Sequence, residues 1–89
     1  MKLVPVKQAQ ARLFNAMADK TLRQLTLSTF KKDRSLTLER REEGWLLVED
    51  GFQKHREPIP AGAPGKRLLK EAFKREFPRS ANAYIAEVR

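Results

Sequence analysis

The chain has 89 residues, of which 40% are hydrophobic, and carries a formal net charge of +8. A chain of this length builds one hydrophobic core, so we expect a single domain over residues 1–89. The absence of cysteine excludes disulfides, zinc–thiolate sites and cysteine nucleophiles. The longest apolar run, Trp45–Val48, is too short to span a bilayer, and residues 1–5 do not resemble a signal peptide. We therefore expect a cytoplasmic protein with no membrane partner.

The positive charge is concentrated in two blocks of the sequence. Seven basic residues stand against two acidic ones between Lys20 and Arg41, and six against two between Pro64 and Ser80. The stretch between these blocks is locally acidic. Such a distribution favours binding of polyanions through one oriented surface.

A helix is predicted first along the chain, over Lys7–Lys20, where the apolar residues fall at helical spacing. From Thr21 the apolar residues alternate, which predicts one strand before the polar turn at residues 31–34 and a second strand after it, around Leu36 and Leu38. A hairpin follows from this pattern.

Two more turns predict two more strands. Glu42-Glu43-Gly44 leads into a strand at Trp45–Val48, and Asp50-Gly51 is the favoured signal for a two-residue type I′ hairpin into a strand at Phe52–Glu57. Links this short join antiparallel neighbours, so the four strands form a meander.

The last third of the chain predicts a stiff loop, a helix and a further element. Pro58–Gly65 contains three prolines and reads as a loop, Lys66–Phe77 is amphipathic, and Pro78 ends that helix. Residues 81–88 alternate as a fifth strand would, with a short helix after Ser80 as the alternative.

The predicted fold class is α+β, an antiparallel meander of four or five strands with an N-terminal helix and a C-terminal amphipathic helix packed on the sheet. We expect the second helix across one face and the first helix over an edge or the other face. The unbroken apolar run of Trp45–Val48 is typical of a strand covered on both sides. Otherwise either Leu46 and Val48 or Trp45 and Leu47 would face water, so a second covering element or a partner chain is expected.

Three cations of the second predicted helix, Arg67, Lys70 and Lys74, lie at positions i, i+3 and i+7. They form one stripe opposite the apolar side, which indicates a surface that contacts a phosphate backbone. A merely solvated face is the alternative, and Glu71 is placed to pair with Arg67 or Arg75.

The first predicted hairpin carries a basic tip of Lys31, Lys32 and Arg34 that can contact phosphates, or that serves only as a solubilising turn.

The second hairpin combines aromatic and basic residues. A two-residue turn at Asp50-Gly51 pairs Glu49 with Phe52, Leu47 with Lys54 and Trp45 with Arg56. One face then carries the rings and cations of Trp45, Phe52, Lys54 and Arg56. Rings beside cations are the components of a surface for single-stranded nucleic acid. The alternative is that Trp45 packs in the core and that the cations extend outward.

The sequence shows no pattern that is typical of a catalytic site or of a metal site. His55 is the only histidine and is expected to be exposed on a strand, and no serine lies in a G-x-S-x-G motif. Acidic residues such as Glu49 and Asp50 fall at turns, where they are expected to be solvated. We expect no enzymatic activity, no cofactor and no metal.

The element order of a helix, three or four strands and a helix that opens Lys66-Arg67-Leu68-Leu69-Lys70 is similar to that of the double-stranded RNA-binding domain. The loop at residues 31–34 lacks the Gly-Pro and His of that family, so the resemblance implies only that such an order can serve RNA binding.

The sequence therefore predicts a non-catalytic nucleic-acid-binding accessory domain, for DNA or RNA, that contacts phosphates through the helix stripe and the hairpin tip. The alternative is a protein-interaction module, or a homodimer formed through an open sheet edge or face, with no role in nucleic-acid binding.

Overall fold

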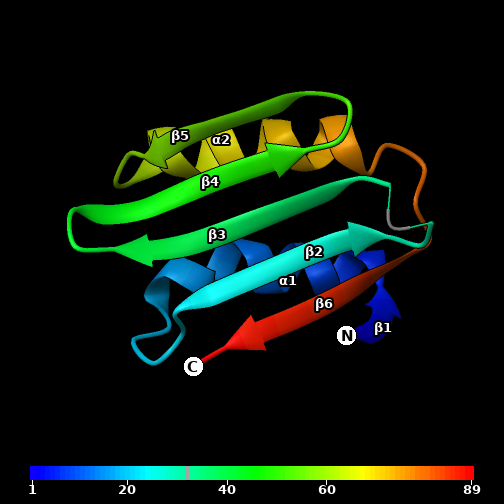
Figure 1. Ribbon diagram of the computed structural model, residues 1–89, viewed down its shortest axis with the longest axis horizontal. Coiled ribbons are helices and arrows are strands. Elements are labelled where there is room, and N and C mark those ends of the chain that lie inside the picture. The colour runs from blue at the N-terminus through cyan, green and yellow to red at the C-terminus, as the bar shows by residue number, and fades with distance from the viewer. Residues whose placement is uncertain (32) are drawn as a thin grey trace.

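The computed structural model describes residues 1–31 and 33–89, and over these residues the chain forms a six-stranded antiparallel sheet and two α-helices (Figure 1). The α+β class and the antiparallel meander predicted from the sequence are confirmed. In chain order the elements are β1 (Lys2–Pro5), α1 (Val6–Asn15), the 3₁₀ helix η1 (Ala16–Ala18), β2 (Gln24–Thr29), β3 (Ser35–Arg41), β4 (Gly44–Asp50), β5 (Lys54–Ile59), α2 (Ala63–Glu76) and β6 (Asn82–Val88).

The strands follow one another across the sheet in the order β1-β6-β2-β3-β4-β5. The C-terminal tail is a strand, as the alternation of its residues predicted, and it lies between β1 and β2. Strand β1 was not predicted, because four residues are too few to display a period. It pairs with β6 through Leu3 opposite Tyr84 and Val4 opposite Ala83.

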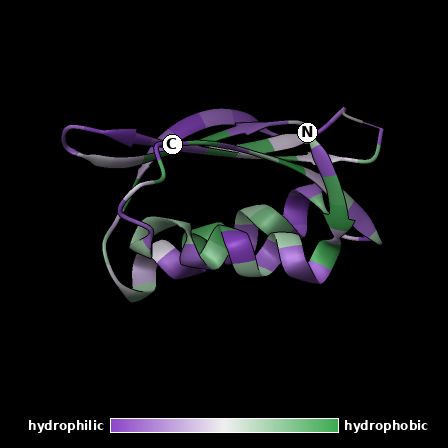
Figure 2. Cartoon of the chain, turned by 90° about the horizontal axis from the view of Figure 1, so that it is seen from below, coloured by the Kyte–Doolittle hydropathy of each residue, from purple (hydrophilic) through white to green (hydrophobic). Residues whose placement is uncertain are grey.

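Both helices lie on the same face of the sheet (Figure 2), so the prediction that the first helix covers an edge or the other face is wrong. The strand register explains this arrangement. Leu25, Leu38 and Leu47 are aligned across β2, β3 and β4, and all three are fully buried. The leucines form a single apolar layer, and one layer of helices is enough to cover it. Both helices lie in this covering layer.

The other face of the sheet is covered by no element of the described residues (Figure 2), so the prediction that a second element covers β4 is wrong, while cover by a partner chain stays a prediction. Leu46 and Val48 lie on this face and are half-buried. Val48 is flanked by Thr37 on β3 and Arg56 on β5. The aliphatic part of the arginine side chain can shield a neighbouring valine from water, which reduces the cost of this exposure.

The turn between β4 and β5 differs from the predicted two-residue hairpin. Asp50 pairs with Lys54, which leaves residues 51–53 as the loop, and Gly51 lacks the positive φ that a type I′ turn requires. The Glu76 carboxylate at the end of α2 accepts hydrogen bonds from the backbone N–H groups of Phe52 (2.8 Å) and Gln53 (3.3 Å). This tertiary contact favours the longer loop over the local turn.

The longer loop shifts the register of β5 by three residues from the predicted one. Trp45 pairs with Ile59 instead of Arg56, and Glu49 pairs with His55. An odd shift turns every side chain of a strand to the other face. Lys54 and Arg56 consequently lie on the uncovered face, while Trp45 faces the helices and packs against the core, as one of the two interpretations predicted.

The helix boundaries differ from the predicted ones. Helix α1 ends at Asn15 and not at the predicted Lys20, and the chain continues as η1. The helical segment stops at Asp19, which is extended and whose carboxylate accepts hydrogen bonds from the N–H and hydroxyl of Thr21. Helix α2 begins at Ala63, three residues earlier than predicted, with Pro64 in the first turn, where its missing N–H is not needed. Within the described residues, neither helix has the length and apolar character needed to cross a membrane.

Gly65→Ala tests the contact between the start of α2 and the preceding loop. Helix propensity alone predicts a gain of about 1 kcal/mol. A Cβ at this position would overlap the carbonyl oxygen of Pro60, so we expect a net loss of about 2 kcal/mol in the free energy of unfolding, measured with urea.

Gly62→Ala is the comparison variant. A Cβ there meets no atom within 4 Å, so its cost of about 1–3 kcal/mol comes from the backbone conformation alone (φ 76°, ψ −150°), which is nearly exclusive to glycine. A Gly65→Ala variant more stable than the natural chain would contradict the close packing of α2 on this loop.

Candidate nucleic-acid interface

Four cations line the outward side of α2. Lys66, Arg67, Lys70 and Lys74, here called the α2 stripe, are all exposed. The opposite side of the helix is buried through Leu69, Ala72 and Phe73, so the amphipathic character predicted for this segment is confirmed. Across the part of the chain that the structure describes, no carboxylate lies within 4.0 Å of a stripe cation.

The α2 stripe destabilises helix α2. Lys66 and Lys70, and likewise Lys70 and Lys74, are like charges at i and i+4, each pair destabilising by about 0.2–0.5 kcal/mol. Lys66 lies in the first turn, where the helix dipole disfavours a cation, and that turn contains no acidic residue. A bound anion would relieve both effects.

A groove runs beside the stripe, between the two helices. Because α1 and α2 run in opposite directions, the end of α1 lies next to the first half of α2 (Figure 1). The interhelical groove has a volume of about 420 Å³ and is lined by Phe14, Asn15, Lys66, Arg67 and Lys70. Sequence reasoning missed the first three of these residues. The period of α1 marks Phe14 only as a residue near the core, and no sequence signal places it beside α2.

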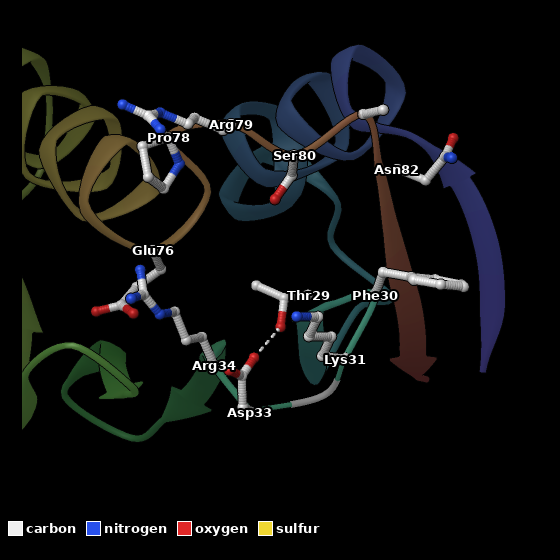
Figure 3. A pocket seen from close by; sticks show the side chains of 11 residues that line it. Thr29, Phe30, Lys31, Asp33, Arg34, Glu76, Pro78, Arg79, Ser80 and Asn82 are labelled. Atoms are coloured by element: carbon white, nitrogen blue, oxygen red, sulfur yellow. Dashed lines mark hydrogen bonds between the residues drawn. The ribbon is translucent and has the colours of Figure 1, made fainter.

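The basic tip of the β2–β3 hairpin borders a second hollow, the hairpin pocket, of about 440 Å³ (Figure 3). Lys31 and Arg34 line it together with Arg79, which lies in the loop after α2 and was not predicted. Lys32 lies outside the described residues. Asp33 also lines the pocket, and a hydrogen bond from the Thr29 hydroxyl (2.8 Å) holds its pKa below the ordinary range. The hairpin pocket therefore contains charges of both signs.

Arg34 links the hairpin to the end of α2. Its guanidinium group lies 5.9 Å from the centre of the Phe52 ring and donates a 3.4 Å hydrogen bond to the carbonyl of Arg75. The hairpin tip is thus on the same side of the molecule as the last turn of α2. Since these contacts occupy the guanidinium group, Arg34 has less freedom to contact a ligand than Lys31.

Lys54 and Arg56 are not brought together with the α2 stripe. Both lie on the uncovered face of the sheet, with the helical layer on the opposite side (Figure 2). Lys54 is 4.0 Å from Asp50, and Arg41 on the same face hydrogen-bonds to Glu39. The uncovered face is therefore close to neutral.

Several cations of the first basic block serve the fold. Arg40 donates hydrogen bonds to the carbonyls of Leu22 and Asp19 and stacks on Trp45 at 4.7 Å. The Asp19 side chain in turn accepts a hydrogen bond from Arg89, which lowers its pKa to about 2. These contacts remove charge from one end of the sheet and leave the α2 stripe as the concentrated source of unpaired charge.

A buried ionic cluster joins α2 to β4. The Arg75 guanidinium donates two hydrogen bonds to Glu49, at 3.0 and 2.7 Å, so Arg75 pairs with Glu49 and not with Glu71. The prediction that Glu49 is solvated at a turn is wrong, because its side chain is fully buried. His55 is likewise half-buried against the helical layer, 3.6 Å from Glu49, and is not the exposed histidine that was expected.

The two buried carboxylates of this cluster have opposite pKa shifts. Burial would raise the pKa of Glu49, but the hydrogen bonds from Arg75 and Glu76 lower it below its usual range. Burial and the contact with Glu49 raise the pKa of Glu76. Of the two carboxyls, Glu76 is therefore the one that is more readily protonated. Among the described residues, no group of three acidic or histidine side chains is arranged to hold a metal ion.

Comparisons with protein-family models, with curated proteins and with solved structures gave no match. The element order of the structure adds β1 before the first helix and β6 after the second, so the similarity to the double-stranded RNA-binding domain covers only the elements between them.

Glu76→Gln tests the raised pKa of Glu76. Because the folded-state pKa of Glu76 is raised, its contribution to stability is full below the ordinary glutamate pKa and is lost as the pH rises through the folded-state value. We expect this contribution to the free energy of unfolding of the natural chain to fall as the pH rises above the ordinary glutamate pKa and through the raised folded-state pKa of Glu76. Glutamine keeps a donor towards Glu49 and an acceptor for Phe52. The free energy of unfolding of the variant, measured by urea denaturation, should therefore vary less with pH than that of the natural chain.

Glu71→Gln is the matched control, since it removes one exposed carboxylate from the same helix and should leave the profile of the natural chain unchanged. If the free energy of unfolding varied with pH in the same way for the natural chain and for Glu76→Gln, the raised pKa of Glu76 would be contradicted.

Proposed function

We propose that this domain binds nucleic acid without catalysing a reaction, and that the α2 stripe supplies the phosphate contacts. The observation that carries the proposal is the sorting of charge. Among the residues that the structure describes, the stripe cations are exposed and form no ion pair, whereas carboxylates such as Glu39, Asp50 and Glu87 pair with arginine or lysine side chains on other surfaces.

The stripe provides a linear array of cations. Lys66 and Lys74 are eight residues apart, which corresponds to about 12 Å along the helix axis. Lysine and arginine neutralise phosphates and release counterions, so affinity depends on salt and little on base sequence. Lys31 and Arg79 at the hairpin pocket prolong the array beyond the C-terminal end of α2, and Lys32 in the same hairpin tip is proposed to join them.

A second candidate function is self-association through the uncovered sheet face. Leu3 and Val88 are exposed large apolar side chains that lie on it. The sheet edges favour it less, because β1 is only four residues long and β5 carries Pro58, which lacks a backbone donor. A sedimentation mass of one chain at high protein concentration would contradict this second candidate.

The combined substitution Lys70→Glu and Lys74→Glu tests nucleic-acid binding. We expect the affinity for fluorescent single- and double-stranded oligonucleotides to fall at least tenfold at 50 mM salt, because two attractive contacts become repulsive. The dependence of log K on log salt should also become shallower, by about 0.7 to 0.9 for each phosphate contact that is lost. Fluorescence anisotropy at two salt concentrations measures both effects.

The matched control reverses two cations on the opposite face, Lys54→Glu and Arg56→Glu. It changes the net charge by the same amount, and it should weaken binding far less. Equal losses in the two variants would indicate diffuse attraction to a basic protein and would defeat the proposal, as would an absence of binding by the natural chain at low salt.

A further inference from the structure

We infer that the interhelical groove receives one nucleotide of a single-stranded nucleic acid, with its base on the Phe14 ring and its flanking phosphates on Lys66, Arg67 and Lys70. This inference rests on the proposed function and names the kind of nucleic acid that the α2 stripe binds. It goes beyond that function because phosphate contacts alone do not distinguish a single strand from a duplex.

The aromatic ring carries the inference. Phe14 is half-buried: it packs against the hydrophobic core and also lines the groove among three cations. Stacking of a base on an aromatic side chain is tolerant of sequence, because every base offers a π face. In a duplex the bases are already stacked inside the helix, so only an unpaired base can reach a ring that lies below surrounding side chains.

Asn15 adds a polar group at the same place. Its side chain is exposed and lines the groove, and within residues 1–31 and 33–89 it makes no side-chain hydrogen bond. An amide offers both a donor and an acceptor, which suits the edge of a base. The volume of about 420 Å³ lies within the usual range of about 300–1,000 Å³ for small-ligand sites.

The other aromatic residues are engaged elsewhere. Trp45 lies under the Arg40 guanidinium, and Phe52 contacts that of Arg34. Phe30 stacks on Tyr84, with the ring centres 6.2 Å apart. Phe14 is therefore the ring that borders the unpaired cations of the α2 stripe, and the combination of ring and cations that the sequence suggested for the second hairpin occurs between the helices.

The experiment compares fluorescent oligouridine and oligothymidine of twelve nucleotides with a duplex of twelve base pairs, by anisotropy at fixed salt. We expect the natural chain to bind at least one of the single strands about tenfold more tightly than the duplex. Phe14→Leu keeps an apolar side chain in the core and removes the stacking surface. It should weaken single-strand binding about tenfold and leave duplex binding and the salt dependence unchanged.

Two controls accompany this variant. Phe14→Tyr retains the ring and should bind single strands as the natural chain does, and Phe52→Leu removes an exposed ring away from the groove and should have no effect. Chemical-shift mapping of the natural chain needs no substitution: the ring resonances of Phe14 should move on titration with the oligomer that binds, and those of Phe52 should not.

The outcomes separate the two proposals. Equal affinities for single strands and duplex, or ring resonances of Phe14 that stay fixed, overturn the groove inference. The proposed function still stands in that case if the variant with Lys70→Glu and Lys74→Glu loses affinity. If that variant binds like the natural chain, the proposed function itself fails.

Discussion

Arg75 and Glu49 join α2 to β4 through two hydrogen bonds, and the arrangement of the helical layer depends on this pair. Glu49 is buried without access to water, so its charge requires the guanidinium group beside it. Removing one partner of a buried pair typically costs about 3–5 kcal/mol, because the remaining charge stays buried. The pair sets the rotation of α2 about its axis: with Arg75 towards the sheet and Phe73 in the core, Lys70 and Lys74 must face outward.

The neighbouring Glu76 extends the same cluster into the sheet. Its carboxylate accepts two backbone N–H groups from the loop after β4, and the register of β5 follows from that loop. Helix α2 therefore determines which face of the sheet Lys54 and Arg56 occupy. As a result Lys54 lies beside Asp50 on the uncovered face, while the cations of the α2 stripe lie on the helical layer.

Parts of the candidate site were predictable from residues close together in the sequence. The stripe of Arg67, Lys70 and Lys74 depends only on the helical period, and the structure keeps these cations exposed. The grouping with Lys54 and Arg56 was not predictable, because it required the register of a hairpin whose turn is set by a contact from another element. Phe14 and Arg79 escaped prediction for a related reason, since each joins the cations only through the packing of distant segments.

The sequence alone determined the α+β class, the antiparallel meander, the C-terminal strand and the two amphipathic surfaces of α2. These features follow from periodicity and short links, which act within a few residues. Only the tertiary structure decided that both helices share one face, that β5 is shifted by three residues, and that Glu49 is buried beside Arg75. Each of these depends on which surfaces meet across the fold, where burial and buried charges outweigh local preferences.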